Sequence, residues 1–416
     1  SYMSDKEIRI KELNERLNKR KTRRKLPEIP TPKPILALEN LEIKTERQKK
    51  QREEMILKQS LQDYCYNYDL NIVEVKVIDW IEQDIYFKPN KRNYKFEIPK
   101  TMRITMTYSR DSSKVIINDY IFDKFLQKGS FGSVFKFVPK FKQIGISGFA
   151  LKIILAFNRY HNINSKIISE LKVINKTQET ECLFIKSKNL EIQHPKYMEM
   201  DYEPYNIYRH NEYNLCMALI CMPLADGDTF DLLNKNLLSL EQKKELFGYL
   251  VITLRCVLEN HDLVYPDIKL EQILYFTCRL SDGQIKYIFV LGDLGGFQEF
   301  MDPPVLSHGP KFKYIDKYSL KPINIAMYAL GATWHQLYSS VFLQTQYKTL
   351  SKDNMMYEYK FNEAYVEHIK ARVGMVPRLE EQRNIITKLL YLDPKKFKEK
   401  KHLMYYFDKL IISQYS

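Results

Sequence analysis

The sequence predicts an α+β protein, and the order of its apolar patterns leads to this class. Residues 71–78 alternate between apolar and polar at period two, which indicates a strand. Residues 103–117 read as two apolar runs around a polar turn, which is typical of a β-hairpin. From about residue 118 the order is strands, one helical stretch at 165–176, more strands, and then mostly helices to the end. That succession predicts an α+β fold in two lobes.

Composition places the chain among folded proteins. Its 416 residues suffice for one large two-lobed domain plus an appendage. A hydrophobic content of 44% and an aromatic content of 13% exclude a fully disordered chain. The abundance of Ile, Lys, Asn and Tyr fits an AT-rich gene, as found in some viruses and protists.

Residues 1–60 are expected to form a basic, helix-permissive extension. They carry 17 basic and 10 acidic side chains, so half of the net charge of +14 lies there. The basic run Lys19–Lys25 is followed by Pro27, Pro30, Pro32 and Pro34, which predict a stiff, extended spacer. Two interpretations stay open: a solvated tail, or an arm that contacts nucleic acid, an acidic protein or the nuclear import machinery.

The cysteines and the chain start indicate an intracellular protein, cytoplasmic or nuclear, or carried in a virion if the source is viral. The six cysteines form no CxxC pair and have no histidine at zinc spacing, so neither a disulfide framework nor a zinc site is expected. The first residues are too charged for a signal peptide, and no apolar run reaches membrane-spanning length. We therefore expect no membrane span. The sequence makes no prediction of oligomeric state.

A glycine-containing loop lies between two strand-like runs at Leu126–Val134. Gly129 and Gly132, with Ser130 and Phe131 between them, would let backbone N–H groups approach a polyphosphate closely. Val134 would pack above a flat ring such as adenine. By itself this pattern is weak, because a glycine-rich hairpin is more often only a turn.

The next strand carries one lysine, Lys152, preceded by Ala150, which leaves room for a ring. A buried lysine needs an anionic partner, since an unpaired charge in a low dielectric is costly. Glu170 in the helical stretch is the candidate, and Glu179 or Glu181 are alternatives beyond the helix. A strand lysine whose ammonium simply reaches solvent is the simpler interpretation.

Residues 264–274 read Val-Tyr-Pro-Asp-Ile-Lys-Leu-Glu-Gln-Ile-Leu, and at this point the chain resembles the eukaryotic protein-kinase superfamily over roughly residues 118–412. The resemblance implies that Asp267 accepts the proton of an attacking hydroxyl. It also implies that Lys269 neutralises charge on the transferred phosphoryl group, and a lysine here is similar to Ser/Thr kinases rather than tyrosine kinases.

The resemblance also implies a metal site. The run Gly292-Asp293-Leu294-Gly295 resembles the superfamily's Asp-Phe-Gly element, so Asp293 would hold Mg²⁺ against the phosphates of ATP. Gln272 stands where a second ligand is usually Asn. Its longer side chain predicts weaker metal affinity or a preference for Mn²⁺.

Similarity to the superfamily also predicts the residues around adenine and ribose. This similarity implies that Cys221 takes the gatekeeper position and that the Met222 carbonyl and the Leu224 N–H face the adenine edge. It also implies that Asp228 accepts a hydrogen bond from a ribose hydroxyl. Leu126 and Leu274 would enclose the ring from above and below.

Several positions depart from the superfamily pattern. Tyr265-Pro266 replaces His-Arg, which removes the arginine that reads a phosphorylated activation loop and predicts activity without such phosphorylation. Ala326 replaces a buried Asp, and Phe397 replaces an Arg. Residues 312–316 are weakly similar to the casein kinase I and vaccinia-related kinase group.

Together these observations predict four segments: the extension at 1–60, a small β-containing unit at 61–117, a kinase N-lobe at 118–222 and a kinase C-lobe at 223–416. The predicted function is an ATP-dependent Ser/Thr protein kinase acting on protein substrates. The alternative is a pseudokinase that serves as a binding scaffold, with or without nucleotide. The substitutions at Gln272, Tyr265-Pro266 and Ala326 motivate that alternative.

Overall fold

The computed structural model describes residues 70–108, 111–128, 132–141, 148–158, 165–177, 185–279, 283–300, 322–340, 371, 380–390 and 399–413. Several predicted features lie outside these residues, namely the basic run at 19–25, the proline spacer, Gly129, Ser130, Phe131, the alternative partners Glu179 and Glu181, residues 312–316 and Phe397.

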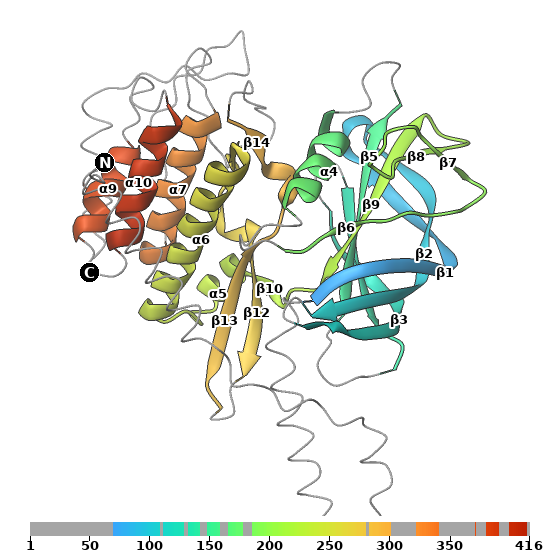
Figure 1. Cartoon of the computed structure of the whole chain (residues 1–416), viewed down its shortest axis with the longest axis horizontal. Helices are drawn as coiled ribbons and strands as arrows, with labels where there is room; N and C mark the ends of the chain where they lie inside the picture. Colours follow the sequence, from blue (N-terminus) through green and yellow to red (C-terminus); the bar gives the residue numbers. More distant parts are fainter. Residues whose placement is uncertain are drawn as a thin grey trace, which may run out of the picture.

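A large antiparallel sheet dominates one side of the molecule (Figure 1). Within the described residues it has nine strands, eight of them in the order β1-β2-β3-β4-β5-β9-β8-β7, and β6 pairs with β9. The strands are β1 (Leu70–Phe87), β2 (Arg92–Tyr108), β3 (Asp111–Lys128), β4 (Gly132–Pro139), β5 (Phe149–Phe157), β6 (Lys188–Asn189), β7 (Tyr197–Glu199), β8 (Tyr208–His210) and β9 (Leu215–Pro223).

The predicted strand at 71–78 and the hairpin at 103–117 are confirmed, as parts of β1 and of the β2–β3 pair. The structure also changes how the N-terminal strands are grouped. The expected boundary between residues 117 and 118 falls inside β3, which pairs with β2 on one side and β4 on the other. Residues 70–117 therefore share one sheet with the strands that follow.

The sheet curls, because β1 packs against β4 as well as pairing with β2. One face is filled by large apolar side chains from both halves of the sheet, including Phe96, Ile98, Phe135 and Leu219. A short helix, η2 (Lys88–Asn90), joins β1 to β2. The curl gives this face its own hydrophobic core.

The opposite face of the sheet packs against α4 (Ser165–Thr177), which agrees with the helix predicted at 165–176. Ile154 and Ile220 of the sheet share one apolar cluster with Ile167 and Leu171 of α4. The same cluster continues into the helices on the other side of the molecule (Figure 1). These helices are α5 (Thr229–Asn234), α6 (Leu240–His261), α7 (Pro322–Ser339), α9 (Glu380–Leu390) and α10 (Lys400–Ser413).

Short elements join the sheet to the helices. They are β10 (Gly227–Asp228), β11 (Leu263–Val264), η3 (Leu270–Gln272), β12 (Ile273–Arg279), β13 (Ile285–Leu291), η4 (Leu294–Gly296) and β14 (Gln298–Glu299). β12 pairs with β13 and β10, and β11 pairs with β14. The β10–β12 and β11–β14 pairings each bring together segments from two separate parts of the sequence.

No helix in the described ranges is long and apolar enough to cross a membrane. Cys216 and Cys221 are free and buried. Cys256 and Cys278 are disulfide-bonded, which differs from the expectation that the cysteines form no disulfide framework.

Candidate functional site

Lys152 lies at the centre of a charge cluster. Its Nζ is 2.7 Å from Glu170 Oε1 on α4 and 3.0 Å from Asp293 Oδ1, which directly precedes η4. The Lys152 and Glu170 side chains are largely buried, whereas Asp293 keeps 36% of its side chain exposed. The predicted pairing of Lys152 with Glu170 therefore forms, and Asp293 adds a second carboxylate.

The mutual charges govern protonation here. Burial alone would lower the pKa of Lys152, but the neighbouring charges of Asp293 and Glu170 and its hydrogen bonds outweigh burial and raise that pKa. Burial would raise the pKa of Asp293, yet the charge of Lys152 and its hydrogen bond hold that pKa below its ordinary value. Lys152 is therefore cationic and Asp293 anionic at neutral pH.

A second pair stands beside this cluster. Lys269 Nζ lies 3.1 Å from Asp267 Oδ2, and burial raises the pKa of Asp267 despite the charge of Lys269. Gln272 joins the two groups, because its Nε2 lies 3.2 Å from Asp267 Oδ2 and 3.4 Å from Asp293 Oδ2. A single amide thus spans two carboxylates that come from different loops.

This arrangement suits a cation bound between the two carboxylates. Asp267 Oδ1 is buried and accepts no hydrogen bond within the described part of the chain. The Gln272 amide places a positive N–H dipole between Asp267 and Asp293, and rotating the amide by half a turn would present an oxygen to a metal ion instead. In the described ranges no group of three or more His, Cys, Asp or Glu side chains is placed to hold a metal.

Two glycines of η4 permit this close assembly. A Cβ at Gly295 would lie 2.5 Å from Glu170 Oε2, and a Cβ at Gly296 would overlap the ring of Tyr265. Glycine at both positions lets α4 and the Tyr265 ring approach the loop that carries Asp293.

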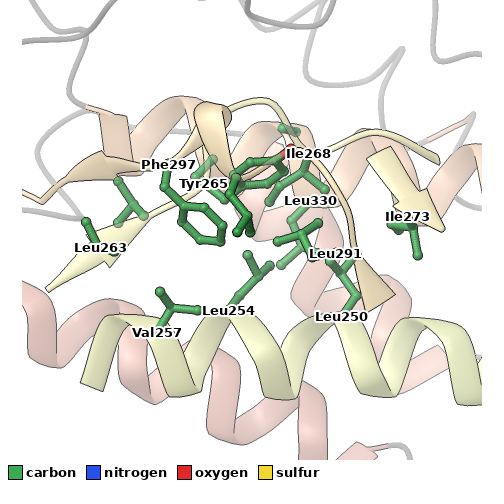
Figure 2. Packing of buried hydrophobic residues seen from close by; sticks show 14 of the residues in the cluster. Leu250, Leu254, Val257, Leu263, Tyr265, Ile268, Ile273, Leu291, Phe297 and Leu330 are labelled. Atoms are coloured by element: carbon green, nitrogen blue, oxygen red, sulfur yellow. The ribbon is translucent and has the colours of Figure 1, made fainter. Parts of the chain in front are cut away.

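Tyr265 fixes the floor of the site. Its ring is fully buried, lies 4.7 Å from the ring of Phe297 and packs near Ile268 and Leu330 (Figure 2). Ile174 and Leu294 belong to the same buried cluster. Buried packing of this kind leaves the loop from 265 to 272 little freedom to shift.

The strand register corrects the role predicted for Cys221. Lys152 is paired with Ile220 and Ala150 with Met222, so the side chains of Ala150, Lys152, Ile220 and Met222 share one face. Cys221 points to the other face, into the core with Leu219. An error of one residue along a strand exchanges its two faces. Ile220 lies directly opposite Lys152, and Met222 is the next β9 side chain on the same face.

Leu224 also needs correction. Its N–H donates to the carbonyl of Gly148 at 3.1 Å, so this donor is already used within the protein. It is not free to face a ligand as expected.

The other predicted binding residues lie on β3, β4, β10 and β12. Val134 lies directly across from Lys152 on β4. Asp228 pairs with Leu274 through β10 and β12, and its carboxylate caps α5 by accepting from Asp231 N at 2.9 Å. Leu126 is 39% exposed. Gly132 packs its backbone against Ile153, where a side chain would not fit.

Four contacts were not predicted from the sequence. Glu299 of β14 binds Lys176 and Lys172 of α4 at 2.7 and 3.4 Å. Two buried threonines, Thr229 and Thr333, hydrogen-bond to carbonyls next to Lys269. The i,i+4 spacing of Lys172 and Lys176 puts both on one helix face, and this spacing is the sequence feature that could have suggested a carboxylate shared by the two lysines. The threonines carry no such signal, because buried threonine is common in helices.

A scan against protein-family models and a search of curated proteins both find no match for this chain.

Proposed function

We propose that this chain is a divergent protein kinase that transfers the γ-phosphate of ATP to Ser or Thr hydroxyls of a protein substrate. One observation carries the proposal: Lys152 is bonded to Glu170 and Asp293 together, beside the Asp267–Lys269 pair. These groups come from four segments, and an ordinary structural ion pair has no need of the Asp267 loop.

The two-lobed arrangement follows from the same proposal. The curled sheet with α4 serves as the N-lobe, and the elements from β10 onward, with helices α5 to α10, serve as the C-lobe. β9 ends at Pro223, close to the expected division between residues 222 and 223.

Each residue has a chemical task in this function. Lys152, held by Glu170, donates to phosphate oxygens of ATP, and Asp293 with Gln272 would hold Mg²⁺ or Mn²⁺. Such an ion neutralises phosphate charge when it is bound. Val134, Ala150, Met222 and Leu274 supply apolar surface for adenine.

The transfer step uses the second pair. Asp267 accepts the proton of the substrate hydroxyl while that oxygen bonds to the γ-phosphorus. The bond between the γ-phosphorus and the bridging oxygen breaks, and ADP leaves with that oxygen. Lys269 donates to the transferred phosphoryl group. The raised pKa of Asp267 suits a base, since a base works best with a pKa near the working pH.

The test is a transfer assay on the purified full chain with γ-labelled ATP, Mg²⁺ or Mn²⁺, and general protein substrates. Transfer to Ser or Thr supports the kinase. Nucleotide binding measured by thermal shift without any transfer would instead support the scaffold alternative, which the Gln272 substitution favours. The protein substrate, and a partner for the basic run Lys19–Lys25, are likewise proposals.

Gln272 gives a prediction on metal use. Gln272→Asn shortens the amide to the length usual at such a ligand position, so we expect the half-saturating Mg²⁺ concentration to fall by roughly tenfold. Metal titrations of transfer rate measure this, with Gln83→Asn on β1 as the matched control. A higher Mg²⁺ requirement in Gln272→Asn would show that Gln272 is no metal ligand.

Glu299 gives a prediction on regulation. Its ion pairs with Lys172 and Lys176 link β14 to α4, the helix that carries Glu170. The Glu299 carboxylate thus holds Glu170 in place without requiring a phosphate group. Phosphatase treatment should leave the wild-type rate unchanged. Glu299→Gln should lower kcat about threefold, as expected for a partly exposed pair.

A charge exchange tests the same contact. The double variant Glu299→Lys with Lys176→Glu should recover part of the lost rate, and a double-mutant cycle measures the coupling. Glu259→Gln, which breaks a pair with Arg255 on α6, is the control. A strong loss of wild-type activity after phosphatase treatment would contradict the prediction.

A further inference from the structure

Two buried threonines hold the backbone on both sides of Lys269. Thr229 Oγ1 donates to the carbonyl of Leu270 at 2.7 Å, and Thr333 Oγ1 donates to the carbonyl of Ile268 at 3.2 Å. Thr229 is 0% exposed and Thr333 is 3% exposed. They come from different helices, α5 and α7, so hydrogen bonds from two elements hold the loop.

The geometry of Thr333 is unusual for a helical threonine. Inside a helix the threonine hydroxyl commonly donates to a carbonyl three or four residues earlier in the same helix. Thr333 reaches across to a different segment instead. Its position is seven residues after Ala326, so both residues lie on one face of α7.

Ala326 itself cannot make a polar contact. It lines a small apolar cavity together with Tyr265 and Ile268, directly beneath the loop. The polar link from α7 to this loop is therefore made by Thr333, two turns further along the helix.

Two more carbonyls of the loop accept backbone hydrogen bonds. Gln272 N donates to the Lys269 carbonyl at 3.0 Å, and Gly292 N donates to the Gln272 carbonyl at 2.9 Å. Lys269 is extended, with φ of −159° and ψ of 158°, between the two carbonyls held by threonine. The Lys269 side chain therefore reaches Asp267 from a backbone that has few other conformations open to it.

We propose that Thr229 and Thr333 are positioning residues that fix the backbone of Lys269, and through Lys269 the orientation of Asp267. This inference rests on the proposed kinase function for its effect on rate, although the backbone restraint itself does not depend on that function. Losing the Thr333 hydroxyl should matter more than losing the Thr229 hydroxyl. The Leu270 carbonyl also accepts from Ile273 N, whereas the Ile268 carbonyl accepts, among the described contacts, from the Thr333 hydroxyl alone.

The experiment replaces each hydroxyl while keeping the side-chain shape. Thr333→Val should lower kcat about tenfold with the KM for ATP unchanged, because a buried carbonyl loses its donor. Thr229→Val should lower kcat less, and Thr333→Ser, which retains the hydroxyl, should recover most of the rate. Thr253→Val, at an equally buried threonine of α6, controls for the general cost of removing a buried hydroxyl.

Amide hydrogen exchange of the peptide 264–274 supplies a readout that does not need catalysis. It should become faster in Thr333→Val and stay as in wild type in Thr333→Ser and Thr253→Val. Unchanged exchange and unchanged kcat in Thr333→Val would overturn the inference, as would a loss of kcat that serine does not restore. If the wild type transfers no phosphate, the proposed function fails, and the exchange measurement still decides whether the threonines restrain the loop. If Thr333→Val does not fold, the comparison of Thr333→Ser with Thr229→Val decides it by the same two readouts.

Discussion

Asp267→Asn is expected to reduce phosphoryl transfer by about a thousandfold or more, because asparagine cannot accept the proton of the substrate hydroxyl. Asn keeps the size of Asp267, and its side-chain oxygen still accepts from Lys269 and Gln272, whose donors lie 3.1 and 3.2 Å away. The fold should therefore persist. Since burial raises the pKa of Asp267, removing its charge also removes a desolvation cost, and the melting temperature should not fall.

The measurement is γ-phosphate transfer at saturating ATP, together with ATP binding by thermal shift. Binding should survive in Asp267→Asn while transfer disappears. Asp231→Asn on α5 is the matched control, since this exposed carboxylate pairs with Lys235 at the surface. Retained transfer in Asp267→Asn would remove Asp267 from the chemistry and favour a contaminating kinase or another base.

Lys152→Met should both abolish transfer and destabilise the fold. Without the ammonium, the buried Glu170 carboxylate and the partly exposed Asp293 carboxylate both lose their cationic partner. Breaking a buried ion pair in this way costs about 3 kcal/mol of unfolding free energy, the lower end of the usual range, because solvent reaches Asp293. Denaturant unfolding of the wild type and the variant at neutral pH measures the loss.

The pH dependence sharpens this prediction. In the wild type, Lys152 holds the pKa of Asp293 below its ordinary value, so that stabilisation is present above about pH 4 and is lost as pH falls through the lowered pKa. The pKa of Lys152 is raised, so its contribution is complete at neutral pH and is lost only in strong alkali.

In Lys152→Met both carboxylate pKa values should rise, and protonation should relieve their repulsion. The stability difference from wild type should therefore shrink between pH 7 and pH 5. Lys136→Met, which breaks the more exposed pair with Asp123 on the neighbouring strands, should show a small and pH-independent difference. A difference for Lys152→Met that stays constant with pH would mean that the carboxylates are solvated rather than held by Lys152.

The sequence determined the elements and the identity of the charged groups. Apolar periodicity placed the strand at 71–78 and the helix at 165–176, because side-chain spacing of two or 3.6 residues is a local property. A lysine in an apolar strand needs a carboxylate, which pointed to Glu170 before any geometry was known.

Tertiary structure decided which face of the sheet each side chain lies on and which distant residue it contacts. Cys221 and Met222 are neighbours in sequence, and only the pairing of β5 with β9 decides which of them shares a face of the sheet with Lys152. Glu299 meets Lys176, and Thr333 meets Ile268, across separations of 123 and 65 residues. Contacts of this kind depend on how distant segments pack, and no local pattern encodes them. The grouping of residues 70–117 with the later strands has the same cause, since strand pairing is a property of the whole sheet.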